Sequence, residues 1–363
     1  MTLPIPAGAR GGPAVSQRTT PLKADSFRVG LTADFLDGEG NLPPWDVGID
    51  ILRAVTGDYV FMPDVAEVEP EMIAGLDAVV ARIPRFTART LEGVERLTIL
   101  ARFGVGYDTV DIPACTRAGV VVTITPDGVR RSMAETVLTM LFALSHRLTI
   151  KERDLRAGRW QDRVRHFGIG LERRTLGLIG IGNIGAEVFR LAAPLGMRHL
   201  AHDPYADPAA AAELNITLVG LETLLHESDF LSVNCPLNVE TRHLIGAGEL
   251  ALMKPTAYLI NTARGGVVDQ AALAAALCDD GIAGAGVDVF EQEPIDPNDP
   301  LLDLDNVILT PHNLNFTDAS WRDNGESAFR AVARVARGEA PPFVVNPEVL
   351  ETELFRKKLA RYR

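Results

Sequence analysis

The chain has 363 residues, 47% of them hydrophobic and 23% charged, which is enough for two ordinary domains with a buried core each. Its formal net charge of −12 disfavours both nucleic acid and an anionic membrane surface as partners. The three cysteines, Cys115, Cys235 and Cys278, lie far apart in the sequence. This spacing predicts no disulfide framework and no metal site, and it fits a reducing cytoplasm.

The first 26 residues are rich in Gly, Pro and Thr and contain no apolar run long enough for a signal peptide, so we interpret them as a mobile tail. The longest apolar run, residues 133–144, is too short to span a membrane. Ser132 and Glu135 have the spacing of a capping box, and apolar residues follow at helical intervals. We therefore predict a buried helix over residues 132–148.

Short apolar, β-rich runs alternate with helical patterns on both sides of this helix. Strands are predicted before it at residues 28–33, 78–82, 98–102 and 120–125, and after it at 175–180, 198–203, 230–234, 257–261, 285–289 and 307–310. The alternation predicts an α/β protein with two doubly wound parallel-sheet domains.

The domain boundaries follow from this pattern. A helical segment after the last strand is expected to return to the first domain, which would then comprise residues 27–130 and 315–350 and bind the substrate. Residues 131–314 would form the second domain. The cluster of basic residues at 351–363 is expected to be a solvated C-terminal tail.

The run from Thr175 to Gly185 is an apolar strand that enters a G-x-G-x-x-G pattern formed by Gly180, Gly182 and Gly185. Glycines at this spacing permit a tight turn, a close approach of pyrophosphate, and close packing of the next helix, whose N-terminus faces the phosphates. The following strand ends at Asp203, which would bind the adenosine ribose hydroxyls and repel a 2′-phosphate. The pattern predicts a Rossmann domain that prefers NAD over NADP.

Arg264, Glu293 and His312 come near the ends of later predicted strands, and the carboxyl ends of such strands face the ligand crevice. Reducing a 2-keto acid requires a cation for the carboxylate and keto oxygen, and a proton donor for the alkoxide. A guanidinium suits the first task, and a histidine beside a carboxylate suits the second because its pKa, ordinarily about 6.5, can be raised. Each residue alone also has an ordinary structural interpretation, such as a strand-end salt bridge or a loop position.

Several separated motifs, spread over about residues 28–350, carry a resemblance to a known family. They are Gly104-Val-Gly-Tyr-Asp108, Thr125-Pro126, Ser132-Met-Ala-Glu135, Gly180 to Gly185, Pro236-Leu237 with Thr241, Asn261 to Gly266, Val287 to Pro294, Thr310 to His312, and Val345-Asn-Pro347. Together they resemble the D-isomer-specific 2-hydroxyacid dehydrogenases. The resemblance implies a flavodoxin-like substrate domain, a Rossmann NAD-binding domain, a cleft between them, and a homodimer built around the long helix.

The resemblance also implies roles for individual residues. Arg264 would bind and polarise the substrate, His312 would be the acid/base, and Glu293 would hydrogen-bond His312 and raise its pKa. The expected cofactor-binding residues are Gly180, Gly182, Asn183, Ile184, Gly185, Asp203, Pro236, Thr241, Thr262, Ala263, Arg264, Asp288 and His312, with Asp288 orienting the nicotinamide carboxamide. The expected substrate-binding residues are Val105 and Gly106, through their backbone, together with Arg264 and Arg82.

These residues predict an NAD-dependent oxidoreductase that interconverts a small D-2-hydroxy acid and its 2-keto acid. Phosphoglycerate dehydrogenase and glyoxylate-hydroxypyruvate reductase types both remain open. Formate dehydrogenase shares the fold, but Glu293 argues against it because formate oxidation needs no proton donor. An NAD-binding, corepressor-like interaction module of the same fold is the alternative. After His312 the chain runs Asn313-Leu-Asn-Phe316, where the family usually has small residues, so the substrate's side chain stays undetermined.

Overall fold

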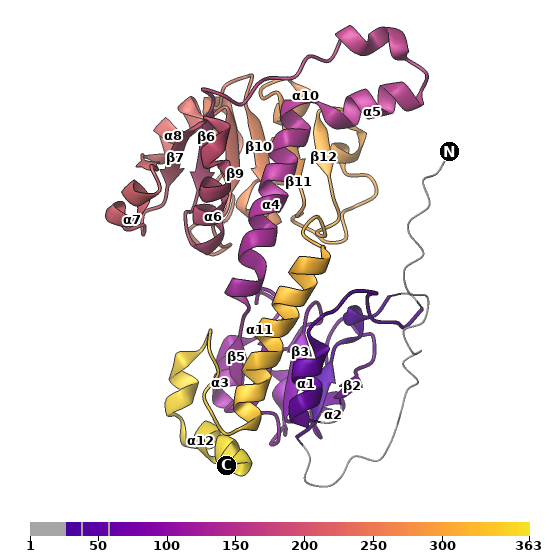
Figure 1. Cartoon of the computed structure of the whole chain (residues 1–363), viewed down its shortest axis with the longest axis vertical. Coiled ribbons are helices and arrows are strands. Elements are labelled where there is room, and N and C mark those ends of the chain that lie inside the picture. The colour runs from indigo at the N-terminus through magenta and orange to yellow at the C-terminus, as the bar shows by residue number, and fades with distance from the viewer. Residues whose placement is uncertain (1–26, 38, 57–58) are drawn as a thin grey trace. The chain divides into compact units, whose positions relative to one another are not determined.

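The chain forms two compact units in the computed structural model, which describes residues 27–37, 39–56 and 59–363. The first unit comprises Met1–Val129 and Thr317–Arg363, and the second comprises Arg130–Phe316. The sequence placed these boundaries after residues 130 and 314. The chain leaves the first unit through α4 (Pro126–Ser145) and re-enters it just before α11 (Asp318–Ala336) (Figure 1). The tail expected at residues 1–26 lies outside the described residues.

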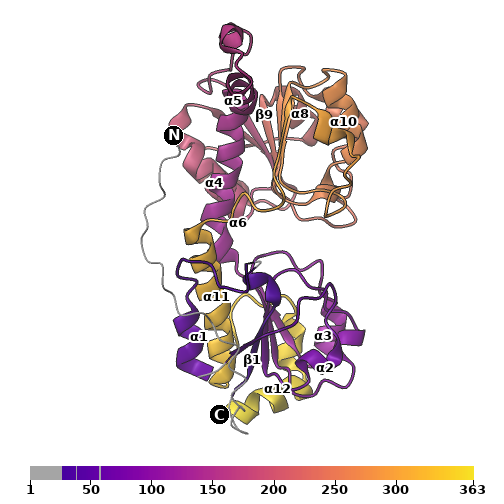
Figure 2. The same cartoon turned by 90° about the vertical axis from the view of Figure 1, so that its right-hand side faces the viewer.

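The first unit contains a five-stranded parallel sheet in the order β2-β1-β3-β4-β5, which is the flavodoxin-like order. Its strands are β1 (Val29–Leu31), β2 (Tyr59–Phe61), β3 (Ala78–Ala81), β4 (Ile99–Arg102) and β5 (Val121–Thr123). Figure 2 shows α1 (Ile49–Thr56) and α11 on one face, and α2 (Pro70–Ile73) and α3 (Ile112–Arg117) on the other. Because both faces are covered, consecutive strand residues such as Val79 and Val80 are buried in different core clusters.

The second unit contains a seven-stranded parallel sheet in the order β12-β11-β10-β9-β6-β7-β8. Counted from β6, this is the Rossmann order 3-2-1-4-5-6 with a seventh strand added. The strands are β6 (Thr175–Ile179), β7 (Arg198–His202), β8 (Thr217–Leu218), β9 (Phe230–Val233), β10 (Tyr258–Asn261), β11 (Gly284–Val287) and β12 (Val307–Leu309). The two doubly wound parallel sheets predicted from the sequence are thus confirmed.

Six further helices belong to the second unit: α5 (Leu148–Arg156), α6 (Asn183–Ala192), α7 (Pro208–Glu213), α8 (Leu221–Glu227), α9 (Ala247–Leu252) and α10 (Gln270–Cys278). The long helix α4 packs on β11, where a Cβ on Gly286 would lie 2.9 Å from the sulfur of Met140. Within the described residues, no helix combines the length and the hydropathy needed to cross a bilayer.

The N-terminus of α4 differs from the prediction. The helix begins at Pro126 and not at Ser132, so Ser132 lies inside it and its carbonyl accepts a hydrogen bond from Thr136 Oγ1 at 2.9 Å. Proline suits the first turn of a helix because its φ is already helical and its missing N–H would have no partner there. The capping-box interpretation was therefore wrong, and Glu135 instead pairs with Arg131 on the helix surface.

The C-terminal segment also differs from the prediction. Residues expected to form a solvated basic tail form α12 (Glu353–Leu359) and a short 3-10 turn, both part of the first unit. Lys358 is only 1% exposed, and its Nζ donates to the carbonyls of Leu97 and Ala118 at 2.7 Å each. Phe355 and Leu359 are buried beside it in the core. Two backbone acceptors and an apolar helix face hold this basic segment against the sheet.

Candidate active site

The three glycines of the G-x-G-x-x-G turn have separate structural tasks. Gly180 adopts a φ of +88°, which disfavours any other residue. A Cβ on Gly185 would lie 2.3 Å from the Gly180 carbonyl oxygen, so only glycine lets α6 approach the turn this closely. Gly182 precedes α6, and a Cβ there would meet no atom within 4 Å.

This space beside Gly182 is where a ligand can approach the backbone. The helix α6 begins at Asn183, directly after this turn, and the N–H groups of a helix's first turn point outward along the helix axis. Such donors at a helix N-terminus bind phosphate oxygens. The turn therefore fits a dinucleotide pyrophosphate.

Asp203 follows β7, and the turn partly orients its carboxylate. Its Oδ2 accepts from the Ile181 N–H at 3.0 Å, and its Oδ1 accepts from the Tyr205 N–H at 2.9 Å. Each oxygen can accept a further hydrogen bond, so the pair suits a ribose diol. Glu240 accepts from the Tyr205 hydroxyl at 2.9 Å and adds a second negative charge nearby, which disfavours a 2′-phosphate.

The other cofactor candidates lie after β9 and β10. Thr241 Oγ1 donates to the Pro236 carbonyl at 2.6 Å and so closes the loop after β9. Thr262 is buried and Ala263 is half-buried directly after β10. In the sheet β9 lies next to β6 and β10 lies next to β9, and the loops that follow such strands in a doubly wound sheet form the ligand-binding edge.

Arg264 lies in the turn after β10. Asn261 holds this turn, since its Nδ2 donates to the Arg264 carbonyl at 3.0 Å and its Oδ1 accepts from the Ala263 N–H at 3.1 Å. A Cβ on Gly265 would lie 1.9 Å from the carbonyl carbon of Phe290. Glycine at 265 is therefore what allows the arginine turn to lie against the loop after β11, a requirement that the sequence pattern did not reveal.

Glu293 and His312 form a direct hydrogen bond between the loops after β11 and β12. His312 Nδ1 lies 2.8 Å from Glu293 Oε2, while Glu293 Oε1 accepts from the Phe290 N–H at 3.0 Å. An ionised carboxylate only accepts, so Nδ1 carries a hydrogen and Nε2 faces away from the glutamate. His312 has a φ of +52°, an uncommon conformation for a residue other than glycine.

The charges around Glu293 keep it ionised. Burial raises its pKa, but the hydrogen bond and charge of His312, the N–H of Phe290 and the charge of Arg264 outweigh burial and hold that pKa below its usual range. Arg264 thus acts electrostatically on the same carboxylate that binds His312. The three residues predicted from separate motifs meet at one edge of the second sheet.

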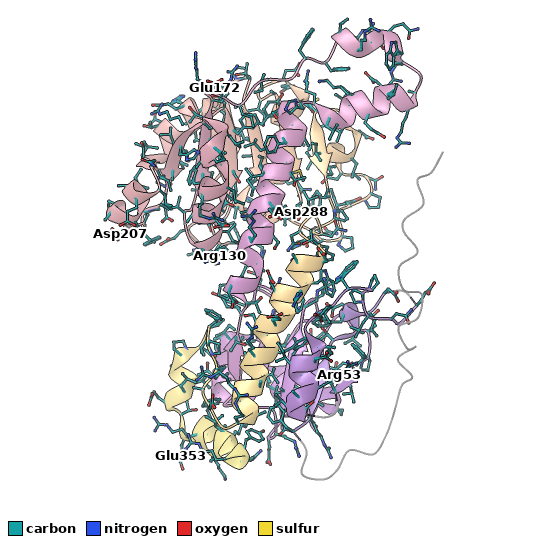
Figure 3. All side chains as sticks on the ribbon, viewed as in Figure 1. Arg53, Arg130, Glu172, Asp207, Asp288 and Glu353 are labelled. Carbon is teal, nitrogen blue, oxygen red and sulfur yellow. The ribbon has the colours of Figure 1, made fainter. Side chains whose placement is uncertain are left out.

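Asp288, labelled in Figure 3, is almost fully buried after β11. Its Oδ1 accepts from Thr310 Oγ1 at 2.6 Å and from the N–H groups of Asn313 and Leu314 at 3.1 and 3.2 Å. Burial raises the pKa of Asp288, and these donors oppose that effect. Asp288 therefore shapes the chain on both sides of His312, a supporting role that the sequence did not predict.

The substrate candidates outside the second unit lie at the strand ends of the first. Val105 and Gly106 are half-buried in the turn after β4, and Arg102 Nε donates to the Gly106 carbonyl at 3.0 Å. Arg82 follows β3, pairs with Asp34, and stacks over Trp321 with its guanidinium carbon 4.6 Å from the ring centre. Burial lowers the pKa of Arg82, and the charge of Asp34 opposes this.

Comparison with known proteins places this site in a family. The family model described as D-isomer specific 2-hydroxyacid dehydrogenase, NAD binding domain, matches residues 138–313. The glyoxylate reductase of Korarchaeum cryptofilum is 41% identical over 285 residues, which cover 77% of this chain and 86% of that protein. The chain belongs to the D-isomer-specific 2-hydroxyacid dehydrogenase family.

Two further relatives support this family assignment. The D-3-phosphoglycerate dehydrogenase of Methanocaldococcus jannaschii is 38% identical over 291 residues, which cover 79% of this chain and 55% of that protein. The crystal structure of a glyoxylate reductase from Paecilomyes thermophila matches with a TM-score of 0.75 and 26% identity, over 89% of this chain and 99% of that one. As a family member, this chain is an NAD-dependent D-2-hydroxyacid dehydrogenase, and NAD is its cofactor.

Proposed function

We propose that this dehydrogenase reduces a small 2-keto acid, with glyoxylate as the preferred substrate, to the corresponding 2-hydroxy acid. The observation that carries the proposal is the 2.8 Å contact between Glu293 and His312, with Arg264 acting on the same carboxylate. This group contains the proton donor and the fixed cation that keto reduction requires. The glyoxylate reductases among its relatives support the choice of substrate.

In this proposal, the turn at Gly180–Gly185 holds the pyrophosphate, Asp203 holds the adenosine ribose, and Asp288 orients the carboxamide. The bound cofactor supplies the hydride. Arg264 binds the substrate and polarises its keto oxygen, and His312 donates its Nε2 proton to that oxygen. Glu293 accepts from Nδ1–H, which fixes the ring's orientation and stabilises its protonated form.

The remaining roles complete the proposal. The backbone N–H groups of Val105 and Gly106 bind the substrate carboxylate, and Arg82 is a further substrate contact. Pro236, Thr241, Thr262 and Ala263 line the cofactor.

The proposed substrate is tested with purified protein, NADH and a panel of 2-keto acids: glyoxylate, hydroxypyruvate, pyruvate, phenylpyruvate and 3-phosphohydroxypyruvate. We expect the highest kcat/KM with glyoxylate, read as loss of NADH absorbance. Preference for 3-phosphohydroxypyruvate would instead indicate a short phosphoglycerate dehydrogenase. Absence of turnover across the panel would favour the NAD-binding interaction module.

The proposed proton donor is tested by His312→Ala. We expect this variant to lose keto reduction while its affinity for NADH, measured by fluorescence titration, stays close to that of the wild type. Normal turnover in the variant would refute the assignment of His312.

We also propose that the protein is a cytoplasmic homodimer. The segment that runs from α5 through the 3-10 turn Trp160–Val164 to Phe167 exposes large apolar side chains, with Trp160 63% and Phe167 78% accessible. A second copy of the chain would bury them. The three free cysteines fit the cytoplasm.

Light scattering tests the dimer. We expect a Trp160→Glu/Phe167→Glu variant to be monomeric. The control is Val239→Glu, which changes an apolar residue elsewhere that is still more exposed, at 93%, and should leave the mass unchanged.

A further inference from the structure

The turn that follows β4 leaves two backbone donors available. Among the described residues, neither the Val105 N–H nor the Gly106 N–H donates a hydrogen bond within the protein. Adjacent N–H groups of this kind form a concave site that suits an anionic oxygen. Their direction depends on the shape of the turn, so the contacts that hold the turn decide how well a carboxylate binds.

Thr125 holds the first residue of this turn from both sides. The Gly104 N–H donates to Thr125 Oγ1 at 2.8 Å, and the Thr125 N–H donates to the Gly104 carbonyl at 3.0 Å. Both polar backbone groups of Gly104 are thereby bonded to Thr125, which directly precedes α4. Gly104 has a φ of +135°, so this reciprocal pair fixes a conformation that few other residues adopt.

Asn324 of α11 fixes the rotation of the Thr125 hydroxyl. Thr125 Oγ1 donates its single hydrogen to Asn324 Oδ1 at 2.5 Å, which turns a lone pair toward the Gly104 N–H. The Asn324 amide is itself fixed, since its Nδ2 donates to the Ser320 carbonyl at 2.8 Å and to the Gly128 carbonyl at 3.4 Å. Both Thr125 and Asn324 are buried, so water does not compete for these bonds.

The first turn of α4 meets α11 closely at this point. A Cβ on Gly128 would lie 2.7 Å from the Asn324 Cα, so glycine allows the two backbones to touch. A separate bond between α4 and α11, from Ser327 Oγ to Asp127 Oδ1 at 2.5 Å, does not reach Thr125 or the Gly104–Gly106 turn. The helix α11 thus makes two bonds here, one to Thr125 that reaches the turn and one to Asp127 that does not.

We propose that Thr125 and Asn324 are positioning residues, which hold the Gly104–Gly106 turn in the shape that presents the N–H groups of Val105 and Gly106 to the substrate carboxylate. This inference rests on the proposed function, in which those N–H groups bind the 2-keto acid. It assigns to α11, far along the chain from the turn, a part in substrate affinity.

The first test compares Thr125→Val with Thr125→Ser. Valine keeps the shape of threonine without the hydroxyl, and serine keeps the hydroxyl. We expect Thr125→Val to raise KM for the 2-keto acid about tenfold to a hundredfold, the loss expected when hydrogen bonds to a charged group fail. Its kcat and its affinity for NADH should stay close to wild type, because only carboxylate binding is impaired. Thr125→Ser should restore the wild-type KM.

The matched control is Ser327→Ala, which removes the bond to Asp127 that does not reach the turn and should leave KM unchanged. Asn324→Ala is a second variant that frees the Thr125 hydroxyl and should raise KM as Thr125→Val does. A wild-type KM in a folded Thr125→Val variant would overturn the positioning role. An equal rise of KM in Thr125→Ser and Ser327→Ala would also overturn it.

Amide hydrogen exchange in the wild-type protein tests the same idea without any variant. The Gly104 N–H should exchange slowly, and those of Val105 and Gly106 quickly. The latter two should slow when NAD and a 2-keto acid, which cannot react with each other, are added together. Fast exchange at Gly104 would contradict the role of Thr125.

The two hypotheses fail in different ways. Absence of turnover with every 2-keto acid would refute the proposed function. Gly104 exchange that is equally slow in Thr125→Val and Thr125→Ser would refute the positioning role alone.

Discussion

Glu293→Gln is the sharpest test of the proposed catalytic pair, Glu293 and His312, because it keeps the shape of the side chain and removes its charge. The carboxylate accepts from two donors, the Phe290 N–H and His312 Nδ1–H. An amide has one oxygen and one nitrogen, so the variant can satisfy only one of these donors. If the amide oxygen stays with Phe290, its NH₂ faces Nδ1 and favours the neutral ring.

The size of the effect follows from the distance and the exposure. The His312 and Glu293 side chains are 45% and 39% exposed, so solvent screens the pair strongly. Two unit charges 2.8 Å apart in a water-like dielectric interact by about 1.5 kcal/mol, equivalent to about a tenfold change in rate. Since Glu293 orients the ring and stabilises the positive charge of the proton donor, its removal should lower the rate of reduction by about that factor.

The assay is kcat/KM for 2-keto acid reduction, measured with NADH at one fixed pH. In Glu293→Gln, we expect this kcat/KM to fall about tenfold. Glu291→Gln is the matched control, because Glu291 forms a second glutamate–histidine pair in the same loop, with His243 at 3.2 Å. A wild-type kcat/KM in Glu293→Gln would refute the role given to the pair, as would an equal fall in the control.

Three further predictions concern the cofactor and the C-terminal segment. The double variant Asp203→Ser/Pro204→Arg should shift the ratio of kcat/KM values with NADPH and NADH toward NADPH, because it replaces a carboxylate by a cation; an unchanged ratio would move the ribose contact elsewhere. Gly182→Ala should keep the wild-type Tm but bind NADH weakly, since its Cβ enters open space, whereas Gly185→Ala should lower Tm because its Cβ would lie 2.3 Å from a backbone oxygen. Equal Tm values in the two glycine variants would contradict this difference. Burial lowers the pKa of Lys358 to about 8 in the folded protein, whereas the pKa of an unfolded lysine is about 10.4. The free energy of unfolding of the wild type, measured in urea, should therefore rise as the pH increases between these two values. Lys358→Met should lack this rise.

The strands of the sheet cores could be predicted because their signal is local. A buried parallel strand is a continuous apolar run, and each of the ten predicted runs overlaps an observed strand. The two missed strands, β2 and β8, are short edge strands with half-buried or exposed residues, so they lack that signal. The start of α4 was predicted wrongly because the sequence offers two local signals for it. The capping-box spacing of Ser132 and Glu135 competes with Pro126, and the helix begins at the proline.

The local motifs predict the cofactor site. The tasks of Gly180, Gly182 and Gly185 follow from backbone geometry within a few residues, and Asp203 follows from the length of one strand–helix–strand unit. The sequence by itself therefore determined the two doubly wound sheets, and it predicts the glycine turn as the dinucleotide site and the residue types that the proposed chemistry needs.

Only the tertiary structure showed how distant residues support one another. Gly265 is required by the backbone of Phe290, Asp288 orders the chain around His312, and Asn324 orients Thr125 from 199 residues away. Each of these contacts joins segments whose local sequences carry no trace of the partner. The physical reason is that close approach and hydrogen-bond direction depend on where the folded chain places two atoms, which neither periodicity nor spacing specifies.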